Sequence, residues 1–319
     1  MGEAVLITGA LGQDGSLLAE HLAGLGHQVV GIVREIPAGA RGAAAPGMRL
    51  LQTDITDEAA WCALLSDLRP ARIYHLAAFH HSSEDQAGTA RVDAWKQMMR
   101  INFQSTYALA CATMKAAPAA HLVFSASSQM YTPRDTVLEV DETTAREPAT
   151  FYGHAKSLSM ELLTFLRKQM GLHASTAILF NHESPRRGAQ FVTRKITRMA
   201  AAAKRGHSGR LDLNNLGARV DWSAASDVVR ALHLMAEAER ADDYVVASGC
   251  LHTVREVLEV AFGHLRLDWR SSVDYREDVA VAALLGRPER IERALGWRRA
   301  VGFERMITAM VDADLEGLG

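Results

Sequence analysis

The sequence predicts an α/β fold in which a doubly wound parallel sheet is followed by a smaller mixed lobe. Short apolar runs rich in β-branched residues alternate with segments of helical spacing over the first 180 residues. This alternation is typical of a parallel sheet with helices on both faces. The first apolar run also ends in a glycine-rich turn that opens a helix, as in nucleotide-binding sheets of the Rossmann type.

The first unit consists of a strand at 4–8, a helix at 16–25 closed by Gly26, and a second strand at 28–33. The Ala-, Gly- and Pro-rich segment at 36–47 is expected to be a loop. Apolar runs predict further strands at 48–52, 72–77, 121–125 and 176–180. In the second half, helical spacing predicts helices near 190–205, 224–238, 253–266 and 302–316.

At 319 residues the chain is long enough for one large or two moderate domains. We expect residues 1–180 to form a Rossmann-type nucleotide-binding domain. Residues 220–248 are expected to return to that domain, while residues 181–319 mainly form a substrate-binding lobe.

The composition argues against several classes of protein. The net charge of −2 and the scattered basic residues give no strong field for nucleic acid or membrane surfaces. No run of about 18 apolar residues predicts a membrane span, and the N-terminus does not resemble a signal peptide. Cys62, Cys111 and Cys250 are widely spaced, which argues against a disulfide framework or a zinc site and fits a reducing cytoplasm.

Gly9, Gly12 and Gly15 follow the first strand and open the first helix. Glycines permit a tight turn and close backbone approach, and the helix N-terminus then faces the pyrophosphate of a dinucleotide. An ordinary glycine turn is the alternative. The strand before these glycines and the helix after them favour cofactor binding.

The residues after the second and third strands bear on the choice of cofactor. Arg34 follows the second strand, where NAD enzymes usually carry an acidic residue for the ribose hydroxyls. An arginine there suits the 2′-phosphate of NADP, although the adjacent Glu35 leaves NAD open and Arg34 could also be a solvated charge. Asp54 and Ile55 follow the third strand and are placed to contact the adenine.

Tyr152 and Lys156 are four residues apart, so on a helix they lie on one face. We expect the lysine ammonium to lower the pKa of the phenol, so that a phenolate takes a proton from a substrate hydroxyl while hydride leaves the same carbon. Ser127, at the end of the strand near 121–125, would hydrogen-bond the same oxygen. This pairing alone is common by chance, but with the glycine loop and the serine it predicts a hydride-transfer site.

Several motifs resemble the GDP-mannose 4,6-dehydratases, a family of extended short-chain dehydrogenase/reductases. Residues 7–16 read ITGALGQDGS, residues 179–188 read LFNHESPRRG, and residues 191–198 read FVTRKITR. Shorter matches continue to residue 315, so the resemblance covers nearly the whole chain. It implies a Rossmann fold, NADP as cofactor and a GDP-sugar held by the C-terminal lobe.

By this resemblance, Gln13 and Asp14 would join the glycines at the cofactor. The residues that would contact the nucleotide, diphosphate or sugar of the substrate are Asn181, Arg187, Lys195 and Arg276. A solvated charge is the alternative for Arg187 and Lys195, and a strand end is the alternative for Asn181.

The chain departs from the family at the end of the fourth strand. The family chemistry begins with oxidation at C4, after which the glutamate of a Thr-x-Glu motif removes the C5 proton and helps expel the C6 hydroxyl. Here the motif is Ser127-Ser128-Gln129, with Ser128 expected at the substrate. An amide cannot accept a proton near neutral pH. Besides 4,6-dehydration, a C4 epimerase or 4-keto reductase and a non-catalytic NADP-binding sensor therefore remain open.

Two further departures affect the substrate site. Val220 stands where the family has arginine before Asp-Trp, and Arg219 is one position earlier, where it could still meet the diphosphate. Phe79, His80 and His81 stand where the family has Gln-Ser-His. His80 could replace the missing base, because imidazole transfers protons near pH 7; packing or contact with a substrate hydroxyl are the alternatives. The histidines have no third ligand at a familiar spacing, so no metal site is predicted.

The extended superfamily pairs through the helix that carries the catalytic tyrosine and the preceding long helix, here near 95–115. The resemblance therefore implies a homodimer, with Ala108, Leu109 and Leu163 among the interface residues. The loop after Arg34 is shorter than in the family, where it reaches a neighbouring subunit, so we expect a dimer and not a tetramer.

Overall fold

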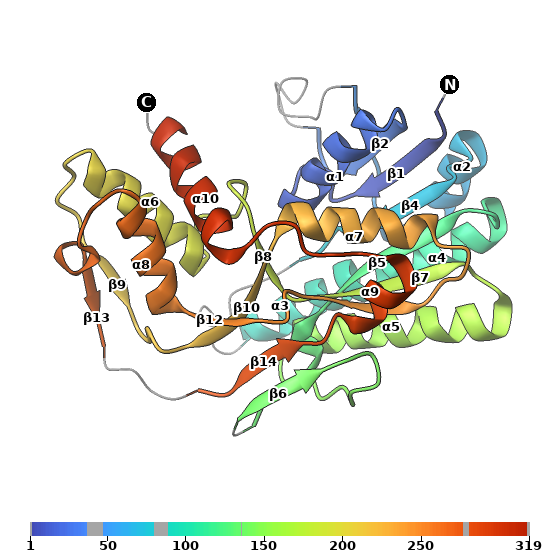
Figure 1. The fold of residues 1–319 in the computed structure, drawn as a ribbon. Coiled ribbons are helices and arrows are strands. Elements are labelled where there is room, and N and C mark those ends of the chain that lie inside the picture. Colours follow the sequence, from blue (N-terminus) through green and yellow to red (C-terminus); the bar gives the residue numbers. More distant parts are fainter. Residues whose placement is uncertain (1, 37–46, 80–88, 135, 277–280, 318–319) are drawn as a thin grey trace.

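The computed structural model describes residues 2–36, 47–79, 89–134, 136–276 and 281–317. A large sheet covered by helices lies beside a smaller lobe, and the two ends of the chain lie on the same side of the molecule (Figure 1). Most of the predicted loop at 36–47 lies outside the described residues.

The large sheet has seven strands in the order β11-β7-β5-β4-β1-β2-β3, and every neighbouring pair is parallel. The strands are β1 (Ala4–Thr8), β2 (Gln28–Val33), β3 (Arg49–Gln52), β4 (Arg72–His75), β5 (His121–Ser127), β7 (Ala174–Leu179) and β11 (Asp243–Val246). The predicted doubly wound parallel sheet is confirmed. The strand order reverses between β1 and β4, and in such sheets ligands bind at the carboxyl ends of the strands flanking this point.

Helices cover both faces of the sheet. On one face lie α1 (Gln13–Gly24), α7 (Ala225–Glu237) and α9 (Glu289–Leu295), which share one hydrophobic core with the sheet. On the other face lie α2 (Glu58–Leu68), α4 (Ser105–Ala116) and α5 (Phe151–Met170), which share a second core.

Ala108, Leu109 and Leu163 belong to that second core and are at most 2% exposed. Their assignment to a subunit interface is therefore wrong. The apolar stripe of each helix that the sequence reveals is the stripe that packs against its own sheet.

The helical segment before β5 is not uniform. A helix at Thr89–Met99 (α3) continues into α4 through a π-helical turn at Arg100–Gln104. Such turns widen a helix locally and often occur at functional sites. This turn lies beside α5 and contributes one of the residues that organise the site described below.

The smaller lobe is built around α6 (Val192–Lys204), α8 (Val254–His264) and α10 (Phe303–Gly317), which enclose a third hydrophobic core including Trp222 and Phe262. Short strands complete it and join it to the large sheet: β6 (Val137–Val140), β8 (Asn181–Glu183), β9 (Leu211–Leu213), β10 (Arg219–Ala224), β12 (Leu251–Thr253), β13 (Val273–Tyr275) and β14 (Ala283–Gly286). They pair as β12-β10-β8, β13-β9 and β14-β6. After β10 the chain crosses back to the large sheet through α7 and β11.

An ion pair ties the long helix α5 to the edge of the sheet. Arg167 Nη1 lies 3.0 Å from Asp243 Oδ1 and its Nη2 lies 2.8 Å from Oδ2, with both side chains only 13% and 11% exposed. We expect Arg167→Met to lower the free energy of unfolding by about 3 kcal/mol, because it leaves a largely buried carboxylate without its cation. Urea denaturation would measure this.

The matched control is Arg134→Met. Arg134 pairs with Glu147, but these side chains are 77% and 57% exposed, so the expected change is below about 1 kcal/mol. Equal losses in the two variants would show that burial does not strengthen the Arg167 pair.

Candidate active site

The turn after β1 is built for close approach of the backbone. Gly9 has φ +69°, and a Cβ there would lie 2.9 Å from the backbone nitrogen of Ala77, in the loop after β4. A Cβ on Gly15 would lie 2.2 Å from the carbonyl oxygen of Gly9. Gly12 is the N-cap of α1, and no side chain among the described residues caps it. The first turn of α1 therefore has room and backbone donors for a phosphate group, which fits a dinucleotide cofactor.

A buried hydrogen-bonded chain fixes this turn against β4. Thr8 Oγ1 lies 2.8 Å from His75 Nδ1, and His75 Nε2 lies 3.0 Å from Ser105 Oγ. Thr8 Oγ1 also accepts the backbone N–H groups of Leu76 and Ala77. Burial, with a contribution from the charge of Lys156, lowers the pKa of His75 to about 3. His75 is therefore a neutral structural group at the point where the strand order reverses.

The predicted catalytic residues meet at the carboxyl end of β5. The helix α5 begins after Thr150, whose hydroxyl accepts the N–H of Gly153 at 3.0 Å. This start places Tyr152 so that its hydroxyl is hydrogen-bonded to Ser127. Lys156 Nζ donates to the carbonyl oxygen of Ser125 at 2.6 Å and lies 5.6 Å from the centre of the Tyr152 ring.

Burial controls the protonation of this pair. It raises the pKa of Tyr152 above its ordinary value, Asp14 adds to the rise, and Arg187 and the Ser127 hydrogen bond oppose it. Burial also lowers the pKa of Lys156 to about 7. The net effect on the Tyr152 pKa is thus a rise caused by burial, and a lowering by protonated Lys156 stays a prediction. A lysine titrating near pH 7 carries only part of a charge, and its nitrogen is directed to Ser125.

Gln129 lies directly beside these groups. Its backbone nitrogen donates to Ser127 Oγ at 3.2 Å, and its side-chain oxygen accepts from Thr150 Oγ1 at 3.3 Å. A Cβ on Gly153 would lie 2.1 Å from the carbonyl oxygen of Gln129, so this glycine lets α5 approach closely. The side chain of Gln129 is exposed, and its amide meets the hydroxyl of Thr150, the residue before α5.

Asp14 forms an ion pair with a residue that sequence reasoning did not single out. His182 Nε2 lies 2.9 Å from Asp14 Oδ2, and His182 Nδ1 lies 2.7 Å from the carbonyl oxygen of Phe180. Burial acts to raise the pKa of Asp14, but the charge and hydrogen bond of His182 outweigh burial, so the pKa of Asp14 is lowered. Burial likewise acts to lower the pKa of His182, and Asp14 reverses this, so the pKa is raised. The pair links α1 to β8.

Gln13 strengthens the same link. Its side-chain nitrogen donates to the carbonyl oxygen of His182 at 3.2 Å, and its side-chain oxygen accepts from Ser184 Oγ at 2.8 Å. The side chains of Gln13 and Asp14, both predicted at the cofactor, therefore bind β8 and the residue directly after it.

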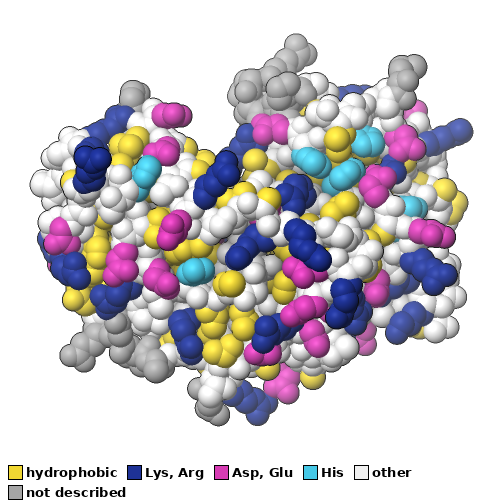
Figure 2. Space-filling view, in the orientation of Figure 1, with side chains coloured by type: hydrophobic (Ala, Val, Ile, Leu, Met, Phe, Trp, Pro, Cys, Tyr) yellow, Lys and Arg dark blue, Asp and Glu magenta, His cyan; other side chains and the backbone are white. Residues whose placement is uncertain are grey.

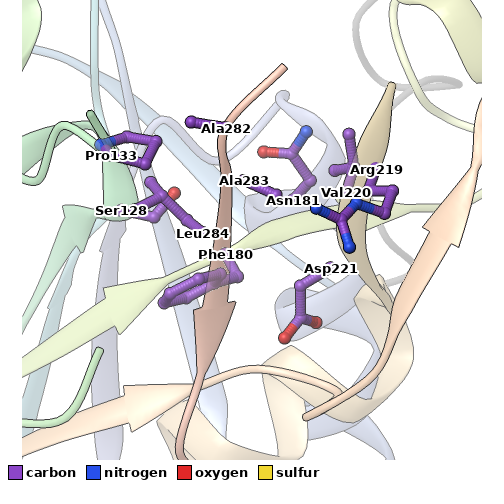
Figure 3. A pocket seen from close by; sticks show the side chains of 10 residues that line it. All are labelled: Ser128, Pro133, Phe180, Asn181, Arg219, Val220, Asp221, Ala282, Ala283 and Leu284. Atoms are coloured by element: carbon purple, nitrogen blue, oxygen red, sulfur yellow. The ribbon is translucent and has the colours of Figure 1, made fainter. Parts of the chain in front are cut away.

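A cavity of about 210 Å³ brings together three of the predicted substrate-binding residues, Ser128, Asn181 and Arg219 (Figure 3). Figure 3 shows Asn181 and Arg219 on one side of the cavity and Ser128 on the other, with the β14 segment passing between them. Most of the remaining wall is apolar, and its residues are Pro133, Phe180, Val220, Ala282, Ala283 and Leu284.

Asp221 also lines this cavity, but its carboxylate is committed to the fold. One oxygen accepts from the backbone nitrogen and hydroxyl of Ser248, and the other accepts from the backbone nitrogens of Gly249 and Gly286. Burial raises its pKa while these hydrogen bonds oppose the rise. Asp221 thus holds β14 beside β10 and so keeps the apolar wall in place.

Three other predicted substrate residues do not line this cavity. Arg187 lies 3.3 Å from Glu183 Oε2 and stacks on Phe191 at 3.5 Å. Lys195 is exposed in the first turn of α6, and Arg276 is exposed after β13. Their contact with substrate stays a prediction.

The residues predicted at the adenosine half of the cofactor lie where the strands end. Arg34 is exposed directly after β2. The carboxylate of Asp54 accepts from Arg100 Nη2 at 2.8 Å and from the backbone and hydroxyl of Thr56, and these Thr56 hydrogen bonds lower its pKa. Ile55 packs partly against the core. The adenine contact of Asp54 and Ile55 stays a prediction.

His80 and His81 lie outside the described residues, but the chain leading to them is anchored by Asn102 from the π-helical turn. Its side-chain amide exchanges two hydrogen bonds of 2.8 Å with the backbone of Phe79, and the backbone carbonyl oxygen of Asn102 accepts from Ser159 Oγ on α5. Sequence reasoning missed Asn102. The available signal was an asparagine within the long helical segment near 95–115.

The surface shows no continuous field of one charge on the face in Figure 2, where basic, acidic and apolar side chains are mixed. Within the described ranges, no group of three or more His, Cys, Asp or Glu side chains could hold a metal ion. Likewise, no helix in the part of the chain that the structure describes is long and apolar enough to cross a membrane.

The sequence matches the family described as GDP-mannose 4,6 dehydratase over residues 6–310. GDP-mannose 4,6 dehydratase 2 of Arabidopsis thaliana is 37% identical over 329 residues, which cover 98% of this chain and 86% of that protein. The human GDP-mannose 4,6 dehydratase is 33% identical over 355 residues, covering 98% and 91%.

The fold is shared with solved structures of lower identity. RMD from Pseudomonas aeruginosa complexed with NADPH superimposes with a TM-score of 0.78 at 19% identity, with 99% of each chain covered. The prediction that the protein is a nucleotide-sugar dehydratase or epimerase is confirmed by these matches. Because the family match spans nearly the whole sequence, the chain belongs to the GDP-mannose 4,6-dehydratase family.

Proposed function

We propose that the protein uses NADP, in preference to NAD, for redox chemistry at C4 of a nucleotide-activated hexose, with GDP as the nucleotide. The observation that carries this proposal is the meeting of Ser127, Tyr152 and Lys156 beside the glycine turn. Membership of the family supports a GDP-sugar. The three cysteines are free thiols, in keeping with the cytoplasmic location that we also propose.

The side chains divide the chemistry between them. The hydroxyls of Ser127 and Tyr152 would hold the oxygen on C4, and Tyr152 would exchange the proton with it. Lys156, held by Ser125, would stabilise the phenolate when protonated. When bound, the nicotinamide accepts or returns a hydride at the sugar carbon.

Family membership supports 4,6-dehydration as the first candidate for the net reaction. Gln129 favours a second candidate, epimerisation at C4 or reduction of a 4-keto sugar, because neither needs a base at C5. The nearby carboxylates in the described residues are already engaged: Asp14 with His182, Glu183 with Arg187 and Thr193, and Asp221 with backbone groups. A non-catalytic NADP-binding sensor is the remaining alternative.

Incubation of the protein and NADP with GDP-mannose and a panel of nucleotide sugars, followed by mass spectrometry, separates these reactions. Loss of water identifies a dehydratase, and unchanged mass with altered retention identifies an epimerase. A gain of two hydrogens by a 4-keto sugar with NADPH identifies a reductase. Cofactor binding without turnover of any sugar would favour the sensor.

Arg34→Ala should weaken NADP binding by about tenfold or more, because a charged hydrogen-bonded contact with the 2′-phosphate is lost. NAD binding should change far less, since NAD lacks that phosphate. Calorimetric titration with both cofactors measures the difference. Equal losses for NADP and NAD would remove Arg34 as the residue that discriminates between them.

We propose that the protein is a homodimer that pairs through α4 and α5. Large apolar side chains on these helices remain exposed: Tyr107, Phe151, Leu158 and Phe165. Light scattering at low micromolar concentration should give the mass of two chains, and Phe165→Glu should shift it toward one chain. A mass of four chains would contradict the proposal.

A further inference from the structure

The first two turns of α1 line a second cavity, of about 240 Å³, that also involves the smaller lobe. It is lined by Leu11, Gly12, Gln13, Ser16, Glu20 and Arg186. Five of these six residues come from the glycine turn and one side of α1, whereas Arg186 belongs to the segment between β8 and α6. Glu20 and Arg186 are the charged residues of this wall.

Arg186 is held across the cavity by α1. Its Nη1 donates to Ser16 Oγ at 3.0 Å, and its Nη2 lies 2.6 Å from Glu20 Oε1. At its other end, the backbone nitrogen of Arg186 donates to Ser184 Oγ, which in turn donates to Gln13. The side chain of Arg186 is 40% exposed and lines the cavity, so it is not locked in the core.

We propose that Arg186 is a ligand of the cofactor pyrophosphate and that Glu20 competes with this anion for the guanidinium. This inference rests on the proposed dinucleotide cofactor. A pyrophosphate at the N-terminus of α1 lies against Gly12 and Gln13, at the end of the cavity that Arg186 spans. A guanidinium has five N–H donors in a planar fork, so it can hold phosphate oxygens while keeping its hydroxyl contact.

Glu20 has a definite role in this arrangement. A carboxylate in the wall of an anion site repels the anion unless a cation neutralises it. Arg186 supplies that cation, but its contact with Glu20 must weaken as the pyrophosphate binds. Removing the charge of Glu20 should therefore strengthen cofactor binding, whereas removing the charge of Arg186 should weaken it. A purely structural pair would show the same sign for both changes.

The test compares dissociation constants for NADPH and for 2′-AMP, which keeps the 2′-phosphate but has no pyrophosphate. Arg186→Met should weaken NADPH binding roughly tenfold and leave 2′-AMP binding unchanged, and Arg186→Lys should restore part of the loss. Glu20→Gln should tighten NADPH binding by about two- to fivefold, the range that a partly exposed pair supports. Fluorescence titration suits NADPH, and competition NMR suits 2′-AMP.

Arg210→Met is the matched control, because Arg210 and Asp274 form another partly exposed ion pair, in the smaller lobe away from α1; its NADPH affinity should equal that of the wild type. Unchanged NADPH affinity in Arg186→Met would overturn the inference. So would equal weakening of NADPH and 2′-AMP, or weaker NADPH binding in Glu20→Gln, since Arg186 would then only fasten the loop. A wild-type protein that binds neither NADPH nor NADH would instead remove the proposed cofactor itself, and the Arg186 assignment with it.

Discussion

Tyr152→Phe should lower kcat by about 10³-fold or more, within the range known for loss of a positioned acid–base group and its oxygen contact. NADP affinity should be nearly unchanged, because the glycine turn and α1 do not depend on the phenolic oxygen. The substitution removes one oxygen and keeps the ring beside Lys156. Steady-state rates and cofactor titration on the same preparation measure both effects.

Tyr131→Phe provides the matched control for this prediction. Tyr131 is a second buried tyrosine after β5, 3% exposed, and burial raises its pKa to about 12. The charges that act on it are those of Arg146, Glu142, Asp141 and Asp243, whereas Tyr152 is hydrogen-bonded to Ser127 and lies beside Lys156, so loss of the Tyr131 hydroxyl should leave the rate largely intact. If Tyr131→Phe stops turnover and Tyr152→Phe does not, the catalytic roles assigned here are wrong.

Strands such as β1 and β7 could be predicted because each is an apolar run buried on both faces. The edge strand β11, with the sequence DYVV, was not among the predicted strands. The short strands could not be predicted. β8 consists of Asn181, His182 and Glu183, and β12 also has only three residues, of which His252 and Thr253 are polar. Neither has an apolar alternation. They are strands because β10 lies between them and supplies the hydrogen-bonding partner.

The same distinction holds within the site. Tyr152 and Lys156 could be paired from their spacing on one helix. The ion pair of Asp14 and His182 joins positions 168 residues apart, and only the packing of β8 beside α1 creates it. The protonation of Lys156 was also beyond the sequence, because its low pKa comes from burial. Local spacing predicts contacts within one helix, whereas contacts between distant segments and the protonation of buried groups depend on tertiary packing.

Gln129→Glu should create or raise dehydratase activity if the pocket accepts GDP-mannose. The change is nearly isosteric, and Gln129 already contacts Ser127 through its backbone nitrogen and Thr150 through its side chain. A positioned general base contributes typically about 10²–10⁴-fold, so even an imperfectly placed carboxylate should give a measurable gain. Deuterium incorporation at C5 and loss of water are the two readouts.

Two variants separate this effect from a general effect of added charge. Gln169→Glu adds the same carboxylate at an exposed position near the end of α5 and should change neither readout. The double variant Gln129→Glu with Tyr152→Phe should also fail to dehydrate, because the C5 proton becomes acidic only after oxidation at C4. Activity that survives in the double variant would show that the new carboxylate does not act on a 4-keto sugar.

The same assays on the wild-type protein then show whether Gln129 prevents dehydration. If it already dehydrates GDP-mannose and His80→Ala stops this, the histidine supplies the base and the amide is no obstacle. If it exchanges no C5 proton but equilibrates the configuration at C4, the chain is an epimerase that retains a dehydratase scaffold. If no tested sugar nucleotide reacts in either protein, hydride transfer at Tyr152 is not supported and the sensor becomes the leading function. Ser127, Tyr152 and Lys156 account for the hydride chemistry at C4 but do not show whether a proton is also removed at C5. Comparing the wild type with the variant that carries a carboxylate at position 129 therefore tests the C5 step separately from the C4 step.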